Sequence, residues 1–369
     1  MEISFTKMHG SGNDFILIDC IKQPEVTGLE LEGLSKTLCH RRFGIGADQI
    51  LLLCPSEIAD FKMKIYNADG GEVEMCGNGI RCFAKYIWDR GLSRKDVLEI
   101  ETLAGIIKPE RAGDMVKVDM GEPILEPEKI PVDIKSSPPI IDYPLQIKDR
   151  GFKITCVSMG NPHAVIFLGE NISDFPVPTY GPLIEKHPMF PKKTNVEFVN
   201  VQSRTKLLMR VWERGSGETM ACGTGASATG VAAMLKGLTE RNVSVQLLGG
   251  NLLIEWHANN HVYMTGPAAE VFQGMVHYSA AQGKDRRRHQ RHTCSMPLEF
   301  SEKGKSKGAS RACICVDSSE SGMGITSDHE METGQIITFK IKDTPHPKSA
   351  VVIWSKKDRD KYRAGLMFI

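Results

Sequence analysis

The chain has 369 residues, of which 41% are hydrophobic and 25% are charged, and its formal net charge is +1. These values are typical of a soluble globular protein of two or three domains, and the small net charge argues against a nucleic-acid coat or a polybasic membrane binder. No apolar run reaches membrane-spanning length, and the start "MEISFTKMHG" lacks the features of a secretory signal. We therefore interpret the ten cysteines as reduced thiols of a cytoplasmic protein.

Strand signals predominate along the chain. Alternating apolar residues predict half-buried strands, and these lie at 3–5, 15–18, 61–65, 116–118, 154–157 and 165–168. Helical periodicity predicts helices at 31–38, at 80–88 with Gly91 as the C-cap, and from 224 to 236 with Gly237 at the end. Strands outnumber helices, which indicates an α/β fold of the α+β type.

Two short stretches share one unusual arrangement. "MCGNGIRC" begins at Met75 and "ACGTGASA" at Ala221, and each places a cysteine before Gly-x-Gly at the start of a predicted helix. The two cysteines, Cys76 and Cys222, are 146 residues apart, and Gly-Asn pairs at 12–13 and 160–161 recur at an offset of 148. The repeat predicts two similar halves that face each other across a cleft.

Changes in composition suggest the domain boundaries. We expect the first half at 1–120, joined by return strands at 264–278, and the second half at 121–263. A linker is expected at 279–284. The basic run "KDRRRHQRH" and a new series of short strands predict a separate small β domain at 285–369.

The paired cysteines suggest a specific chemistry. A thiol at a helix N-terminus lies beside unpaired backbone N–H groups and the positive end of the dipole, so we expect the pKa of Cys76 and of Cys222 to be lowered. The adjacent glycines let backbone amides approach a carboxylate. One thiolate can remove a proton from a stereocentre while the opposite thiol protonates the other face, which is two-base racemisation or epimerisation.

Simpler interpretations apply to the remaining cysteines. We interpret them as small buried apolar residues; they are Cys20, Cys39, Cys54, Cys82, Cys156, Cys294, Cys313 and Cys315. A Cys76–Cys222 disulfide is an alternative that the reduced environment opposes. Neither Gly-x-Gly copy has a P-loop ending, and no cysteine pair has zinc-ligand spacing, so we expect no metal.

Several blocks in order resemble the diaminopimelate epimerase family from Met1 to about His277. They read "MHGSGNDF", "RRFGIGADQ", "NADGGEVEMCGNGIRC", "MGNPHAVIF", "KTNVEFV" and "WERGSGETMACGTGASA". The resemblance implies interconversion of LL- and meso-2,6-diaminopimelate, without pyridoxal phosphate or metal, on the bacterial route to lysine and peptidoglycan. It also implies two pseudo-symmetric halves, each a curved sheet around a central helix, with the active site between them.

The same resemblance implies roles for individual residues. Cys76 and Cys222 become the acid/base pair, and His163 and Glu213 support the thiols, although a turn residue and a surface charge are the simpler interpretations of these two. A substrate-binding role is implied for Asn13, Gln49, Asn67, Gly77, Asn78, Asn161, Asn195, Glu213, Arg214, Gly223 and Thr224. Arg214 suits a distal carboxylate, which a guanidinium can hold with two hydrogen bonds.

The C-terminal segment carries two further motifs. Arg287 and Arg291 form Arg-x-x-x-Arg, and Asp317, Ser319 and Gly322 form Asp-x-Ser-x-x-Gly. In this order they resemble the PilZ domain, a small β-barrel that binds cyclic di-GMP. Two arginines suit phosphates and a guanine face, while Asp and Ser suit a guanine edge. The alternatives are a solvated basic linker and, more weakly, a grip on nucleic acid.

The sequence thus predicts a cytoplasmic diaminopimelate epimerase with a regulatory domain that binds cyclic di-GMP. We expect no cofactor for catalysis, no nucleic-acid partner and no membrane partner, with a homodimer among the options. Two alternatives remain: another cofactor-independent racemase of the same fold, such as a proline-type racemase, and a non-catalytic second-messenger-binding protein. Arg214 and the asparagines favour diaminopimelate, because a proline site has no second charged head to hold.

Overall fold

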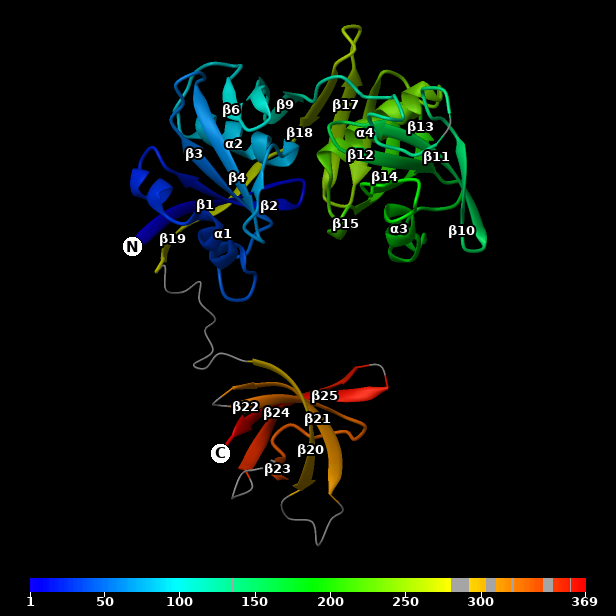
Figure 1. Cartoon of the computed structure of the whole chain (residues 1–369). Helices are drawn as coiled ribbons and strands as arrows, with labels where there is room; N and C mark the ends of the chain where they lie inside the picture. Colours follow the sequence, from blue (N-terminus) through cyan, green and yellow to red (C-terminus); the bar gives the residue numbers. More distant parts are fainter. Residues whose placement is uncertain (135, 280–291, 303–309, 320–321, 341–347, 359) are drawn as a thin grey trace. The chain divides into compact units, whose positions relative to one another are not determined.

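The computed structural model describes residues 1–134, 136–279, 292–302, 310–319, 322–340, 348–358 and 360–369. The chain divides into two compact units, Met1–Gly283 and Lys284–Ile369 (Figure 1). Within these described ranges, no helix is both long enough and apolar enough to cross a membrane.

The first sheet of the N-terminal unit has the strand order β19-β1-β2-β3-β4-β6-β7, with β5 paired to β4. Pairs β2–β3 and β4–β6 are parallel and the other neighbours are antiparallel. The strands are β1 (Glu2–Gly10), β2 (Asn13–Asp19), β3 (Gln49–Cys54), β4 (Phe61–Asn67), β5 (Glu72–Val73), β6 (Ile100–Thr102), β7 (Gly105–Ile107) and β19 (Ala269–His277). The helices are η1 (Pro24–Gly28), α1 (Leu31–Cys39) and α2 (Gly77–Asp89).

The second sheet has the order β10-β11-β12-β13-β14-β16-β17-β18-β9-β8, with β15 paired to β14. Its strands are β8 (Glu110–Ala112), β9 (Met115–Asp119), β10 (Tyr143–Ile147), β11 (Arg150–Ser158), β12 (Pro162–Phe167), β13 (Asn195–Ser203), β14 (Lys206–Glu213), β15 (Gly217–Thr219), β16 (Asn242–Leu247), β17 (Gly250–Trp256) and β18 (Val262–Gly266). Its helices are α3 (Val177–Glu185) and α4 (Gly223–Leu235).

The two sheets repeat one pairing pattern. The successive pairs β1–β2, β2–β3, β3–β4, β4–β6 and β6–β7 alternate between antiparallel and parallel. The pairs β11–β12, β12–β13, β13–β14, β14–β16 and β16–β17 alternate in the same order. Helices α2 and α4 hold equivalent places, after β5 and β15. The pattern confirms the expected pseudo-symmetric halves.

Each half encloses one buried helix, as Figure 1 shows for α2 and α4. Helix α4 contacts β11, β12, β13, β16, β17 and β18. Its buried face is built from small residues, which let the strands approach closely: a Cβ on Gly230 would lie 2.7 Å from Ile254 Cγ2. Both helices are followed by a glycine with positive φ, Gly91 at 64° and Gly237 at 67°, in agreement with the predicted C-caps.

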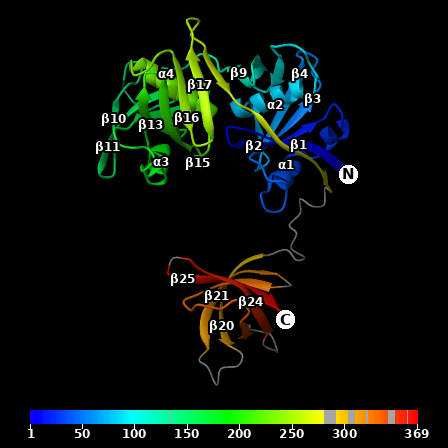
Figure 2. The same cartoon turned by 180° about the vertical axis from the view of Figure 1, so that it is seen from behind.

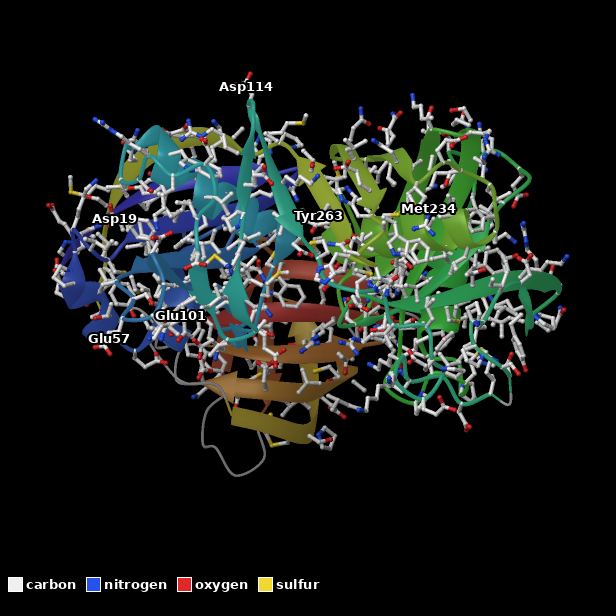
Figure 3. The ribbon with its side chains drawn as sticks, turned by 90° about the horizontal axis from the view of Figure 1, so that it is seen from above. Asp19, Glu57, Glu101, Asp114, Met234 and Tyr263 are labelled. Carbon is white, nitrogen blue, oxygen red and sulfur yellow. The ribbon has the colours of Figure 1, made fainter. Side chains whose placement is uncertain are left out.

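Both crossings of the chain between the halves lie at the edge of the second sheet that is formed by β18, β9 and β8. Strands β8 and β9 precede the second half in sequence but pair with β18, where Tyr263 faces Asp119. After β18 the chain returns to the first sheet, where β19 pairs with β1 (Figure 2). Asp114 lies at the tip of the β8–β9 hairpin (Figure 3).

Helix α3 was not expected from the sequence, because Pro176, Pro178 and Pro182 obscure the helical period. Pro182 lies inside the helix. Its missing N–H removes a hydrogen bond, yet the helix is held by packing. Gly181 lies directly against Trp212, whose indole nitrogen donates to Glu185 at 2.8 Å. Tertiary contacts of this kind cannot be read from local propensity.

In the C-terminal unit, the described strands close into a barrel in the order β20-β21-β22-β25-β24-β23. Their bounds are β20 (His292–Glu302), β21 (Arg311–Ser319), β22 (Gly322–Ser327), β23 (Ile336–Lys340), β24 (Lys348–Asp358) and β25 (Lys361–Phe368). Phe300 and Phe339 are among the largest buried side chains of the core. The unit is the small β domain that the sequence indicated.

Candidate active site

Cys76 is the residue that precedes α2, with an extended backbone (φ −138°, ψ 115°). Its Sγ lies 3.6 Å from Asn13 Oδ1, which also accepts a hydrogen bond from Asn78 Nδ2 at 3.3 Å. Asn13 Nδ2 donates to Asp48 at 2.8 Å. Both ends of the Asn13 side chain are therefore held, with its oxygen turned toward the first thiol.

A charged cluster fixes the loop that carries Asp48. Arg41 donates to Asp14 at 2.7 Å and to Asp48 at 2.6 Å, and Lys7 donates to Asp14 at 2.6 Å. Burial raises the pKa of the Asp14 carboxyl, but the hydrogen bonds from Arg41 and Lys7 outweigh this and lower it to about 2. Asp14 is therefore ionised at neutral pH and anchors both cations beside Asn13.

Cys222 stands in the equivalent position before α4 (φ −126°, ψ 114°) and is buried. Its Sγ accepts from the backbone N–H of Gly225 at 3.4 Å and lies 3.4 Å from Thr224 Oγ1. The Glu213 carboxyl accepts a hydrogen bond from Thr219 Oγ1. Its negative charge raises the pKa of both thiols, after burial, which is the larger effect on each.

The expected lowering of both thiol pKa values is wrong. Burial is the largest effect on Cys76 and raises its pKa, although the N–H groups of Gly79 and Asn78 lower it. The pKa of Cys222 is raised well above its ordinary value, first by burial and then by the negative charges of Glu213 and Glu197. The free-energy cost of removing a thiolate from water exceeds the stabilisation that the helix N-terminus provides.

The N-termini of α2 and α4 meet. Asn78 Nδ2 lies 3.5 Å from the carbonyl oxygen of Ala221, the residue before Cys222. A Cβ on Gly77 would lie 3.1 Å from Met264 Cε, and one on Gly223 would lie 3.3 Å from the same atom. The two cysteine-bearing turns therefore approach one point, and only glycine leaves room there.

Arg81 is a feature that the sequence did not single out. Its side chain is fully buried on α2 and donates to Asn78 Oδ1 at 3.0 Å, to Gly77 O at 3.3 Å and to Ser11 Oγ at 3.3 Å. These acceptors are neutral, and burial lowers the pKa of the guanidinium. Its positive charge lowers the pKa of the Cys76 thiol. An arginine in a buried helix turn was the available signal in the sequence.

His163 lies on β12, fully buried, with Nδ1 2.7 Å from Glu197 Oε1 and Nε2 2.9 Å from Asn161 Oδ1. Glu197 is also a residue that the sequence did not single out. The signal was a glutamate inside the apolar strand run Val196–Val199. The structure thus links two expected residues, His163 and Asn161, through a third that was not expected.

The remaining expected contacts lie at strand ends. Gln49 Nε2 donates to Asn67 Oδ1 at 2.7 Å, and Gln49 Oε1 is buried without a hydrogen-bond partner among the described residues. Asn195 donates to Pro162 O at 3.0 Å and accepts from the backbone of Arg214 at 2.9 Å. The Arg214 side chain is exposed, and its Nη1 donates to Lys192 O at 3.1 Å.

The two motifs of the C-terminal unit lie only partly within the described residues. Arg287 and Arg291 lie outside the described residues. Asp317 Oδ1 accepts from the backbone N–H of Gly324 at 3.1 Å, and its other oxygen lies 3.8 Å from Arg363. Ser319 Oγ donates to Gly322 O at 3.2 Å. Asp317 and Ser319 therefore both lie on β21 of the barrel and bond to residues of the paired strand β22, and Asp317 lies next to an arginine from β25.

Comparison with known proteins identifies the N-terminal unit. A family model described as diaminopimelate epimerase matches residues 5–126 and 155–271. The diaminopimelate epimerase of Moorella thermoacetica is 54% identical over 276 residues, covering 73% of this chain and 98% of that protein. The chain belongs to the diaminopimelate epimerase family. The family member of Methanococcus maripaludis is 51% identical over 280 residues, covering 74% of this chain and 99% of that protein.

As a member of the diaminopimelate epimerase family, the chain is an isomerase. A PilZ domain model matches residues 285–369, so a PilZ domain follows the epimerase. Two solved structures share the epimerase fold. The PhzF-family phenazine biosynthesis protein of Bacillus anthracis has a TM-score of 0.56 at 17% identity, covering 75% of this chain and all of that one. The hydroxyproline epimerase of Agrobacterium vitis has a TM-score of 0.54 at 16% identity, covering 74% of this chain and 92% of that one.

Proposed function

We propose that the N-terminal unit interconverts LL- and meso-2,6-diaminopimelate, with Cys76 and Cys222 as the acid/base pair. The observation that carries the proposal is the meeting of two cysteine-capped helices, where Asn78 contacts Ala221. Diaminopimelate epimerases that are more than half identical to this chain support the choice of substrate.

The proposed reaction needs one thiolate and one thiol. The thiolate takes the α-proton of the substrate, and the thiol gives its proton to the opposite face of the same carbon. The enzyme is left with the two protonation states exchanged, so that protons and charge balance. Backbone amides at the two helix N-termini stabilise the reacting carboxylate. This reaction uses side chains and amides of the chain and requires no cofactor.

The expected substrate contacts divide between the two heads of the substrate. Asn13, Asn78 and Thr224 lie beside the thiols and suit the reacting centre. The exposed Arg214 suits the distal carboxylate, with the ordered Asn195 holding its backbone. His163 and Glu213 support the thiols in this proposal, and Glu213 is also one of the expected substrate contacts.

The proposal is tested by epimerisation in D₂O. Newly formed product should carry solvent deuterium at the α-carbon, while unreacted substrate keeps its proton. Replacing Cys76 or Cys222 by Ala should lower turnover by about 10²–10⁴-fold, as the loss of a positioned acid or base does. Cys82→Ala, a buried thiol next to the site in sequence, is the matched control and should stay active. Near-normal turnover in C222A would contradict the two-thiol mechanism.

The same assay separates the alternative functions. A proline-type racemase would turn over proline, whereas a site built for two charged heads should not. A non-catalytic second-messenger-binding protein would turn over neither substrate. As an enzyme of amino-acid biosynthesis the chain is proposed to act in the cytoplasm, and a homodimer is a further option for its assembly.

We propose a second function for the C-terminal unit, namely binding of cyclic di-GMP and regulation of the epimerase. The PilZ match over residues 285–369 supports the ligand. Asp317 lies beside Arg363 on the described part of the barrel, which suits the recognition of a guanine edge next to a phosphate. Titration of the full chain with cyclic di-GMP is the direct test.

A further inference from the structure

Glu197 is a buried charged residue of the second half that the proposed reaction does not use. It lies on β13 between Val196 and Phe198, and its side chain is fully buried. Oε1 is 2.7 Å from His163 Nδ1, whereas Oε2 has no hydrogen-bond partner among the described residues. A carboxylate in such a place is strongly disfavoured unless it is paired, so a role must explain its presence.

His163 connects Glu197 to one of the expected substrate contacts. Its ring is fully buried and lies between two acceptors, Glu197 Oε1 at Nδ1 and Asn161 Oδ1 at Nε2. The ring therefore links the Glu197 carboxyl to the side chain of Asn161. The orientation of the ring then fixes the side chain of Asn161, one of the expected substrate contacts.

Glu197 also lies near the second thiol. A Cβ on Gly225 would be 2.7 Å from Glu197 Oε1 and 3.3 Å from Cys222 Sγ, so a glycine is required where the carboxylate and the first turn of α4 come together. After burial, the charges of Glu213 and Glu197 raise the pKa of Cys222. The titratable groups that face Glu197 are His163 on β12, Glu213 on β14, Cys156 on β11 and Cys222 before α4.

We propose that Glu197 is a positioning residue for the epimerisation. It acts through His163 to hold Asn161, and through its buried negative charge to keep the proton on Cys222 between turnovers. The inference rests on the two-cysteine function proposed above. In this proposal Glu197 both aligns Asn161, a substrate contact, and keeps Cys222 protonated before the reaction.

The variant Glu197→Gln tests the proposal, because it keeps the shape and one acceptor oxygen and removes only the charge. We expect KM for diaminopimelate to rise about tenfold or more, because a neutral amide holds His163, and through it Asn161, less firmly than a carboxylate does. We also expect the alkylation of Cys222 by iodoacetamide to begin at lower pH, since a nearby negative charge is gone. A change in folding alone would not move this pH profile.

Glu185→Gln is the matched control. Glu185 is also a buried glutamate of the second half, but it accepts from Trp212 Nε1 at 2.8 Å and from the backbone of Gly215 at 3.2 Å. Its replacement should leave KM and the alkylation profile unchanged. A double-mutant cycle tests whether Glu197 acts through His163. In a His163→Asn background, E197Q should no longer raise KM.

The outcomes separate the two proposals. A wild-type chain that does not epimerise diaminopimelate contradicts the proposed function. An active wild type, with E197Q indistinguishable from E185Q in KM and in alkylation, shows that Glu197 is structural only and overturns the inference. If E197Q does not fold, E197D gives the test, because its charge stays but lies further from His163. KM should then rise while the Cys222 profile stays unchanged, and a wild-type KM would overturn the inference.

Discussion

Asn78 Nδ2, on the first turn of α2, lies 3.5 Å from the carbonyl oxygen of Ala221, the residue before Cys222. The contact joins residues that are 143 positions apart in sequence. It ties the turn that begins at Cys76 to the turn that begins at Cys222. The distance between the thiols therefore depends on how the two halves of the epimerase are seated.

The two thiols should become reactive at different pH values. The pKa of Cys76 is raised by burial but lowered by backbone N–H groups and by Arg81, whereas burial, Glu213 and Glu197 raise the pKa of Cys222 well above 9. Because the thiolate is the nucleophile, alkylation should begin at Cys76 and reach Cys222 only at higher pH. Iodoacetamide labelling over a pH series, with both peptides quantified by mass spectrometry, measures this order.

Glu213→Gln provides the control for this difference. Removal of that charge should bring the onset of Cys222 labelling to lower pH and move Cys76 in the same direction, because the charge of Glu213 raises the pKa of both thiols. Labelling of Cys222 before Cys76 in the wild type would contradict the assignment of the resting proton to Cys222.

The packing of α3 predicts an effect on stability. A Cβ on Gly181 would lie 2.6–2.8 Å from the Cβ, Cγ and Cδ2 atoms of Trp212, which is shorter than a van der Waals contact allows. Alanine usually favours a helix over glycine by about 1 kcal/mol, but overpacking of this kind costs about 1–3 kcal/mol. Gly181→Ala should therefore lower the urea concentration at which half of the epimerase is unfolded. The loss of activity with increasing urea measures this midpoint. Gly169→Ala, where a Cβ would meet nothing within 4 Å, should leave the midpoint nearly unchanged.

Much of the fold could be predicted from local patterns. The helical periods at 80–88 and 224–236 and the glycines after them correspond to α2 and α4. The repeated Cys-Gly-x-Gly turns predicted the pseudo-symmetry, because two halves built alike must place equivalent turns alike. Helix α3 was missed, since its prolines break the local period and only its packing on Trp212 holds it.

The electrostatics of the site could not be predicted in the same way. A helix N-terminus indicates a lowered thiol pKa, but the opposite direction follows from burial, which depends on residues far away in sequence. Glu197 is 25 positions before Cys222, and Arg81 donates to Ser11 and Pro267, which are 70 and 186 positions away in the sequence. A charged residue within an apolar run was the only local sign of either.

The C-terminal unit should bind cyclic di-GMP with Arg287 and Arg291 as phosphate contacts. A charge-assisted hydrogen bond contributes about 1.5–3 kcal/mol, so Arg287→Ala should weaken binding roughly tenfold or more. Calorimetry on the full chain at one salt concentration measures the change. Lys361→Ala removes an exposed cation of the same barrel, paired with Asp328 at 3.7 Å, and should bind as the wild type does. Equal weakening in both variants would indicate general charge attraction instead of a specific site.

Cyclic di-GMP should also modulate the epimerase. The motif arginines follow closely after β19, the strand that returns to pair with β1 of the first half, and the backbone of Tyr278 bonds to Met1 at 2.8 Å. Capture of the dinucleotide by this segment would bias the edge of the half that carries Cys76. We expect closure of the halves to exclude water from the thiols, so such a bias should change substrate affinity.

Binding coupling is reciprocal, which makes the regulation measurable from either side. Cyclic di-GMP and a substrate analogue should shift each other's affinity by the same factor, typically about 5–150-fold. Titration of each ligand in the presence and absence of the other gives both values, and Arg287→Ala should abolish the shift while leaving the analogue affinity of the free enzyme intact. Unchanged analogue affinity and unchanged turnover at saturating cyclic di-GMP would mean that the two units work independently on one chain.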